Sequence, residues 1–180
     1  MKKPQSFLLY PFPNSDDPPE LTIYGALFRQ GDILNISSKL SGFIDQVKIP
    51  TPGNKPARKN RLWEVTCFEF FIKANGSKPY WEFNFSPSGN WNVYRFDDYR
   101  EGMTEETAFS SLPFQVSRQT EALNLDVKLN LKKIIPPDLT IRAGVSVVIK
   151  TIDVQTFYWA LAHPAPKPDF HHPESFILEL

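Results

Sequence analysis

Residues 62–99 read LWEVTCFEFFIKANGSKPYWEFNFSPSGNWNVYRFDDY and hold three of the four tryptophans of the chain. Asn75-Gly76, a dipeptide that readily takes positive φ in hairpin turns, interrupts the stretch once. A run of turn-forming residues, SPSGN at positions 86–90, interrupts it again. Three segments of strand character remain, at residues 62–74, 79–86 and 91–96. The pattern predicts a three-stranded antiparallel meander.

Side chains alternate across a β-strand, so the second segment of this meander presents two different faces. Three large aromatic residues share one face, and we expect them in the core: Trp81, Phe83 and Phe85. The opposite face is polar and carries Tyr80, Glu82, Asn84 and Ser86. This polar face is the first candidate for a binding surface.

The first segment of the meander is apolar on both faces, since large hydrophobic residues occupy its odd and its even positions. Such a strand is normally central in a sandwich, covered by a second sheet on one side and by loops on the other. Glu69 lies inside it, and an unpaired buried carboxylate is costly. We therefore expect an ion pair between Glu69 and Arg95 or Arg61, or else a place for Glu69 at the wall of a polar pocket.

Composition limits the function classes. Twenty basic residues balance twenty acidic ones, which disfavours nucleic acid or an anionic membrane as a partner. The apolar run at residues 7–10 is too short for the core of a signal peptide, and we expect a cytoplasmic location. A single cysteine, Cys67, fits a reducing compartment. The length of 180 residues predicts one domain over residues 1–180 and leaves the oligomeric state open.

The rest of the chain repeats the period-two alternation between proline-rich turns. Further strands are expected at residues 7–10, 21–29, 32–40, 43–49, 114–119, 122–131, 141–151, 157–162 and 175–180. Residues 104–109 form the one expected short helix, and residues 50–60 read as a solvated basic loop. The sequence predicts an all-β antiparallel sandwich of about ten or eleven strands with at most one short helix.

Three phrases carry a resemblance to a known family. RLWEVTCFEFFIKA, YWEFNFSPSGNWNVYRFDDYR and YWALAHPAPKPDFHHPESFILEL, at residues 61–74, 80–100 and 158–180, resemble a bacterial family of small proteins classed as DOMON-like. These proteins are related to family 9 carbohydrate-binding modules. The resemblance covers most of the chain from residue 61 onward. It implies a jelly-roll-like β-sandwich with a pocket on one sheet, which holds sugars or haem in the wider superfamily.

Haem and metal ions are weaker alternatives. The haem-binding relatives hold iron with a methionine and a histidine, and Met103 is the residue here that could take the first role, although it lies in a charged loop. All three histidines fall in one proline-rich segment near the carboxyl end. The candidate metal ligands are His163, Asp169 and His171, whose spacing matches no known motif. Sealing one end of the sandwich is the structural alternative for this segment.

Our leading hypothesis is a non-catalytic domain that binds a small polar ligand, with carbohydrate as the leading class. Aromatic rings stack on sugars, while carboxylate, amide and guanidinium groups bind their hydroxyls. The expected ligand-binding residues are Glu69, Tyr80, Glu82, Asn84, Tyr94, Arg95 and His163. One alternative is a hydrolase or lyase that uses His163 or His171 as a base; another is a structural or interaction protein. No nucleophile motif or phosphate loop is recognisable, and the cofactor stays open.

Overall fold

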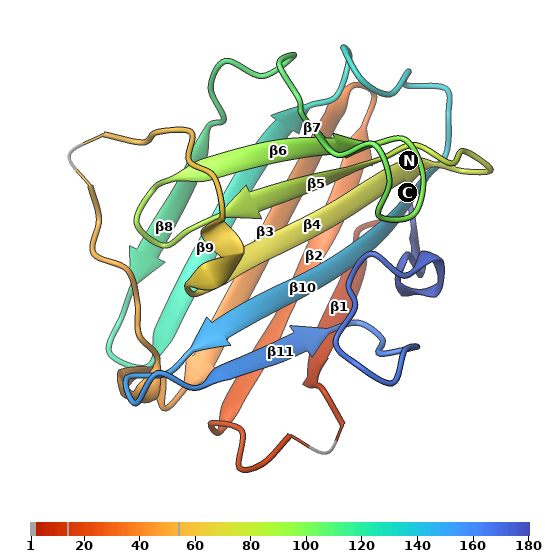
Figure 1. Cartoon of the computed structure of the whole chain (residues 1–180). Coiled ribbons are helices and arrows are strands. Elements are labelled where there is room, and N and C mark those ends of the chain that lie inside the picture. The colour runs from red at the N-terminus through yellow and green to blue at the C-terminus, as the bar shows by residue number, and fades with distance from the viewer. Residues whose placement is uncertain (1–2, 14, 54) are drawn as a thin grey trace.

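The computed structural model describes residues 3–13, 15–53 and 55–180, which form a β-sandwich of twelve antiparallel strands (Figure 1). The strands are β1 (Gln5–Pro11), β2 (Leu21–Gln30), β3 (Ile33–Gly42), β4 (Cys67–Ala74), β5 (Tyr80–Phe85), β6 (Trp91–Phe96), β7 (Thr104–Glu105), β8 (Phe114–Arg118), β9 (Ala122–Asn130), β10 (Ile141–Lys150), β11 (Thr156–Ala160) and β12 (Leu178–Glu179). The predicted all-β antiparallel fold is confirmed. Among the described residues no helix is long and apolar enough to cross a membrane.

One curled sheet supplies both layers. Its strand order is β7-β6-β5-β4-β10-β11-β1-β2-β3-β9-β8, and β12 adds to β10. Strand β1 joins the layers, because Leu9 pairs with Ile23 of β2 while Tyr10 pairs with Ala160 of β11. We call β4–β7 and β10–β12 the front sheet, and β1–β3, β8 and β9 the back sheet. Figure 1 shows β5, β4 and β10 crossing in front of β2 and β3.

The hydrophobic core lies between the two sheets. The aromatic face of β5 points into it, as predicted, and Phe83 and Phe85 are completely buried there. Strand β9 faces them from the back sheet with alternating buried aliphatic residues, while its polar face is mostly exposed to solvent. The inner faces of both sheets thus account for most of the alternation in the sequence.

The predicted meander is present in β4, β5 and β6. Gly76 at the first turn and Gly89 at the second have φ angles of 75° and 88°, which glycine adopts without strain. The second hairpin places Glu82 directly opposite Tyr94 and Asn84 opposite Asn92. The polar positions of β5 and β6 therefore share the outer face of the front sheet.

The outer face of the front sheet is covered as well, which explains why β5 is buried at every position. Aromatic residues from β4, β5 and β6 pack there against Phe170 and Phe176 of the carboxy-terminal segment. Gly144 of β10 permits this close approach, because a Cβ atom at this position would lie 3.1 Å from the carbonyl oxygen of Ser175. Both faces of β4 and β5 are consequently largely buried, as predicted for the first segment of the meander.

Several local predictions are wrong. The first segment enters its strand only at Cys67, after a 3₁₀ turn at Leu62–Glu64, and residues 43–49 contain the 3₁₀ turn Ile44–Gln46 instead of a strand. Residues 104–109 form no helix, since Thr104–Glu105 pairs with the edge of β6. Only Leu178–Glu179 of the final expected strand is extended and paired, after a 3₁₀ turn at Pro173–Ser175. Pairing with a neighbouring strand overrides local propensity in such short segments.

Candidate functional site

A pocket of about 390 Å³ opens on the outer face of the front sheet, and we call it the outer pocket. Five neighbouring strands, β6, β5, β4, β10 and β11, each contribute one residue, and loops contribute the others. The lining residues are Trp63, Glu69, Glu82, Phe96, Arg100, Met103, Val148, Tyr158, Pro168, Phe170 and His171. Aromatic walls around a few converging polar groups are typical of small-ligand sites.

A larger groove of about 560 Å³ lies on the outer face of the back sheet. Its polar residues, among them Asn35, Asp126 and Lys128, are exposed to solvent. The outer pocket differs because its carboxylates are buried, and buried polar groups without partners need an explanation. We therefore take the outer pocket as the candidate site in spite of its smaller volume.

Two glutamates from neighbouring strands define the floor of the outer pocket. Glu69 of β4 and Glu82 of β5 are each 3% exposed, and they lie diagonally on one face because Glu69 pairs with Asn84. Oε1 of Glu82 accepts a hydrogen bond of 2.8 Å from Nδ2 of Asn84. Oε1 of Glu69 and Oγ of Ser146, which lies beside it on β10, are buried and make no hydrogen bond of good geometry among the described residues, although the nearby Ser146 hydroxyl favours the ionised form of Glu69 and so opposes the rise of its pKa.

The expected ion pair between Glu69 and an arginine is wrong. Arg61 pairs with Glu64 instead, next to the 3₁₀ turn. Arg95 pairs with Asp97 at 2.6 Å and lies opposite Trp81 in the register, on the other face of the sheet from Glu69. The other interpretation of Glu69, a residue at the wall of a polar pocket, agrees with the structure.

Burial changes the protonation of both glutamates. It raises the pKa of Glu82 to about 7, although the hydrogen bond from Asn84 and the charge of Arg100 favour the ionised form. Burial, and after it the charge of Glu82, also raises the pKa of Glu69 well above its ordinary value. Since two nearby carboxylates resist ionising together, the pair holds at least part of a proton at neutral pH.

His171 lies beside the glutamate pair as a neutral ring. Its Nδ1 is 2.8 Å from the hydroxyl of Tyr80, which also accepts the backbone N–H of Arg100. We assign the hydroxyl proton of Tyr80 to the hydrogen bond with Nδ1, which places the ring proton on Nε2, 3.8 Å from Oε2 of Glu82. Burial, together with the charge of Arg100, lowers the pKa of His171 to about 4.

An ion pair joins the two loops at the rim of the outer pocket. Arg100 donates from Nε and Nη2 to Oδ1 of Asp169, at 3.2 and 2.7 Å, and the hydroxyl of Tyr99 also donates to Asp169. Asp169 in turn accepts the backbone N–H of His171. The contacts fix the loop after β6 against the carboxy-terminal segment, so that His171 and Phe170 face the front sheet.

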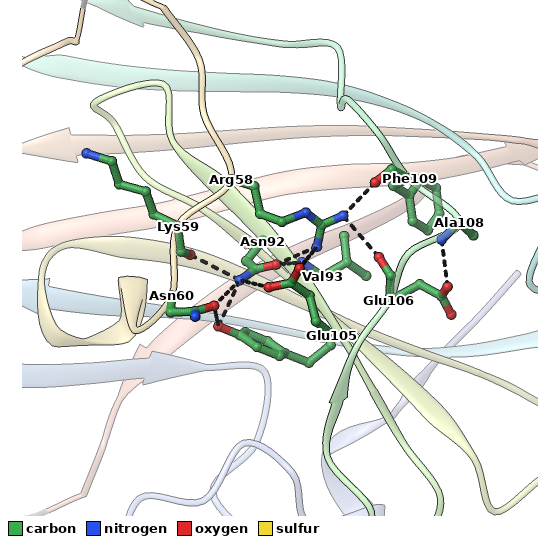
Figure 2. Close-up of polar contacts among 10 residues, drawn as sticks. Arg58, Lys59, Asn60, Asn92, Val93, Glu105, Glu106, Ala108 and Phe109 are labelled. Carbon is green, nitrogen blue, oxygen red and sulfur yellow. Dashed lines mark hydrogen bonds and ion pairs between the residues drawn. The ribbon is translucent and has the colours of Figure 1, made fainter.

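A second polar network, centred on Asn92 of β6, holds the chain that precedes Trp63 (Figure 2). Arg58 donates to Oδ1 of Asn92 at 2.7 Å and lies 4.4 Å above the ring of Trp91. Asn92 also donates to Oδ1 of Asn60 at 2.8 Å. The loop that we expected to be solvated is therefore anchored at its end, where the guanidinium group of Arg58 contacts Asn92 and Trp91 of β6.

Only part of the expected ligand-binding set lines the outer pocket. Glu69 and Glu82 line it. Asn84 and Tyr80 are not lining residues, but Asn84 donates a hydrogen bond to the lining residue Glu82, and the Tyr80 hydroxyl is hydrogen-bonded to the lining residue His171. The structure places three others elsewhere. The hydroxyl of Tyr94 donates to Asn60, Arg95 faces the other way, and Nε2 of His163 donates to the carbonyl of Tyr10.

Sequence reasoning missed most of the aromatic wall. Two of the wall residues could have been predicted from the alternation. Phe96 shares a face of its strand with Tyr94, and Tyr158 lies between two core residues of β11 and therefore points to the outer face. Trp63 lies in a turn, and Arg100 and Phe170 lie in loops without periodicity. No local pattern marks these three residues as members of one site.

The candidate metal set does not come together among the described residues, where no group of three possible ligands is close enough to hold an ion. Haem fits poorly too. Met103 and His171 do line the same pocket, but Nδ1 of His171 is hydrogen-bonded to Tyr80 and Nε2 faces Glu82. Two carboxyl groups on the floor of the pocket disfavour the apolar macrocycle of haem, so the lining fits haem poorly.

No model of a known protein family matches the sequence, and no curated protein matches it. Its fold, in contrast, resembles solved structures. A candidate carbohydrate-binding protein from Bacteroides uniformis has a TM-score of 0.69 and 15% identity, over 97% of this chain and 84% of that chain. A family 9 carbohydrate-binding module from Caldicellulosiruptor kristjanssonii in complex with cellotriose has a TM-score of 0.55 and 8% identity, over 91% and 75%. A module of this family in complex with glucose has a TM-score of 0.51 and 8% identity, over 83% and 71%. The chain therefore has the fold of these modules.

Proposed function

We propose that the protein binds a monosaccharide or a short oligosaccharide in the outer pocket, without catalysis. One observation carries the proposal: the pocket combines aromatic walls with a buried carboxyl group, that of Glu69, whose Oε1 makes no hydrogen bond of good geometry among the described residues. A buried acceptor left unpaired costs about 1–3 kcal/mol. A ligand hydroxyl that donates to Glu69 would recover this free energy, while the apolar face of the sugar contacts Trp63 or Tyr158.

The fold and the size of the site support the proposal. Two solved structures of similar fold hold cellotriose and glucose. A volume of about 390 Å³ falls in the usual range for ligand pockets, roughly 300–1,000 Å³. The three sequence phrases support a finer proposal, that the protein is a bacterial DOMON-like domain, and the single buried cysteine supports a cytoplasmic location.

The position of the glutamates favours binding over hydrolysis. Glycoside hydrolases place two carboxyl groups on either side of the scissile bond. Glu69 and Glu82 instead lie on neighbouring strands of one sheet face and form a common floor. His163, one of the candidate bases, lies outside the lining of the outer pocket.

Replacing Trp63 by alanine is expected to weaken sugar binding by roughly 10- to 30-fold, the loss typical of an aromatic anchor in a binding site. Tyr24→Ala is the matched control, since Tyr24 is an aromatic residue 41% exposed on the back sheet. Calorimetric titration with glucose, xylose, cellobiose and cellotriose measures the effect, and thermal melting checks that both variants fold. The proposal fails if the folded parent binds neither these sugars nor an amino sugar, or if both variants lose affinity equally.

A further inference from the structure

The floor of the outer pocket carries acidic groups that nothing in the described protein neutralises. Arg100 is the one lysine or arginine among the described residues that line the pocket. It is already paired with Asp169, at 2.7 Å. Glu69 and Glu82 have no cationic partner in hydrogen-bond contact among the described residues, because Arg61 and Arg95 are paired elsewhere.

The other titratable groups around the pair do not supply the missing charge. Those that face it from neighbouring elements are Cys67, Tyr80, Tyr94, Arg100, Asp169 and His171. Burial raises the pKa of the Cys67 thiol and of both tyrosines, to about 12 for Tyr80, so these groups are uncharged at neutral pH. His171 is neutral as well, because burial lowers its pKa to about 4. Arg100 is paired with Asp169; its charge still favours the ionised form of Glu82, but it forms no ion pair with either glutamate among the described residues.

The walls of the pocket suit a cation. Trp63, Phe96, Tyr158 and Phe170 contribute aromatic rings, whose faces attract positive charge. Two carboxyl groups on the floor can accept hydrogen bonds: that of Glu69, which has no charged partner, and Oε2 of Glu82, since Oε1 of Glu82 is used by Asn84. An ammonium group has three donors and no acceptor, which matches such a floor.

We propose that the natural ligand of the outer pocket carries a positively charged amino group, which binds between Glu69 and Glu82. This inference rests on the proposed function and names its ligand class: an amino sugar rather than a neutral or N-acetylated sugar. The hydroxyls and the apolar face of the sugar meet the aromatic walls, while the ammonium pairs with the floor. The nearby ammonium favours the ionised form of both glutamates.

Binding therefore releases a proton. The free pair holds at least part of a proton, and the incoming ammonium displaces it into the buffer while keeping its own three protons. A neutral sugar has no charge with which to displace this proton. Proton release thus reports on the position of the amino group independently of affinity.

The test compares matched sugars by titration calorimetry at pH 6.5, where an aliphatic amine is charged. The probes are glucosamine, galactosamine and mannosamine, each beside its neutral parent hexose and its N-acetyl derivative. At least one amino sugar is expected to bind roughly 10- to 100-fold more tightly than both of its neutral counterparts, the effect of a charge-assisted contact. Titrations in two buffers of different ionisation enthalpy should show release of more than about half a proton for the amino sugar.

Variants locate the amino group. Glu69→Gln and Glu82→Gln keep the size of the side chains, and each is expected to remove most of the preference for the amino sugar. Glu64→Gln, with a side chain 50% exposed outside the pocket, is the matched control and should keep the preference. Melting curves establish that each variant is folded before it is titrated.

The outcomes separate this inference from the proposed function. If neutral sugars bind as tightly as amino sugars, the inference is wrong and the proposed function stands. If the amino sugar is preferred but Glu69→Gln and Glu82→Gln keep the preference, the ammonium binds elsewhere and the inference is wrong. If the folded parent binds none of the nine sugars, the inference is wrong, and the proposed function is wrong as well if xylose, cellobiose and cellotriose also fail to bind.

Discussion

Truncation of Phe83 to alanine is expected to lower the free energy of unfolding by about 3–5 kcal/mol, as for other fully buried aromatic residues. Phe83 is completely buried at the centre of β5, in register with Phe70 on one side and Val93 on the other. Its ring contacts Phe109 edge-on, with the ring centroids 5.5 Å apart. Removal of the ring leaves a cavity between the sheets, and denaturant unfolding measures the loss.

Phe43→Ala is the matched control for this experiment. Phe43 is 54% exposed, so its truncation should cost less than about 1 kcal/mol. A similarly small loss at Phe83 would contradict the register of β5, because a shift by one residue would place Phe83 on the outer face and Glu82 in the core.

Replacement of Glu82 by glutamine is expected to stabilise the protein by about 2–3 kcal/mol at pH 8 and to change its stability little at pH 4. Glu82 has a pKa of about 7 in the folded protein, above the ordinary value of 4.5 for a glutamate. Below pH 4.5 the carboxyl group of Glu82 is protonated in both the folded and the unfolded protein. As pH rises toward 7 the unfolded chain ionises first, so the parent loses stability, whereas glutamine cannot ionise. The amide oxygen of glutamine can still accept the hydrogen bond from Asn84.

Groups that do not interact with Glu82 also change the stability of the parent with pH, but they cancel in the difference between the parent and the variant. Glu69 does not cancel, because the charge of Glu82 raises its pKa, so the difference reports Glu82 together with its effect on Glu69. His171, whose pKa is lowered to about 4, costs stability as pH falls below about 6.5. Chemical unfolding of the parent, Glu82→Gln and the exposed control Glu64→Gln at both pH values measures the difference. An equal effect of Glu82→Gln at pH 4 and pH 8 would contradict the buried, raised pKa.

A stabilising substitution on the pocket floor has a functional meaning. Buried ionisable groups that reduce stability persist where they serve binding or catalysis, which is the usual trade-off between stability and activity. The unpaired Oε1 of Glu69 indicates the same trade-off on the neighbouring strand. The two glutamates on the floor of the outer pocket thus lower the stability of the folded protein.

Alternation along the chain was sufficient to predict the two faces of β5. Tyr94 lies opposite Glu82, and Trp81 lies in the core, because period-two patterns in β5 and β6 leave one register that buries the aromatic residues. The turns at Gly76 and Gly89 then set the connections. Local patterns therefore carry enough information for the meander and for the acidic floor.

The sequence could not predict that Arg61 and Arg95 pair with other carboxylates and leave Glu69 without an ion pair. The directions of Arg61 and Arg95 depend on a 3₁₀ turn and on an edge strand, neither of which local composition specifies. The far wall of the pocket depends on the contact between Arg100 and Asp169, which are 69 residues apart in the chain. Long-range loop contacts of this kind have no periodic signature.

The crystal structure of the protein with its tightest-binding sugar tests the central claim most directly. We predict density for the sugar in the outer pocket, with a hydroxyl or amino group within hydrogen-bond distance of Oε1 of Glu69 and the ring against Trp63 or Tyr158. Density for the sugar in the groove of the back sheet beside Phe28 and Asp126, with none in the outer pocket, would contradict the account.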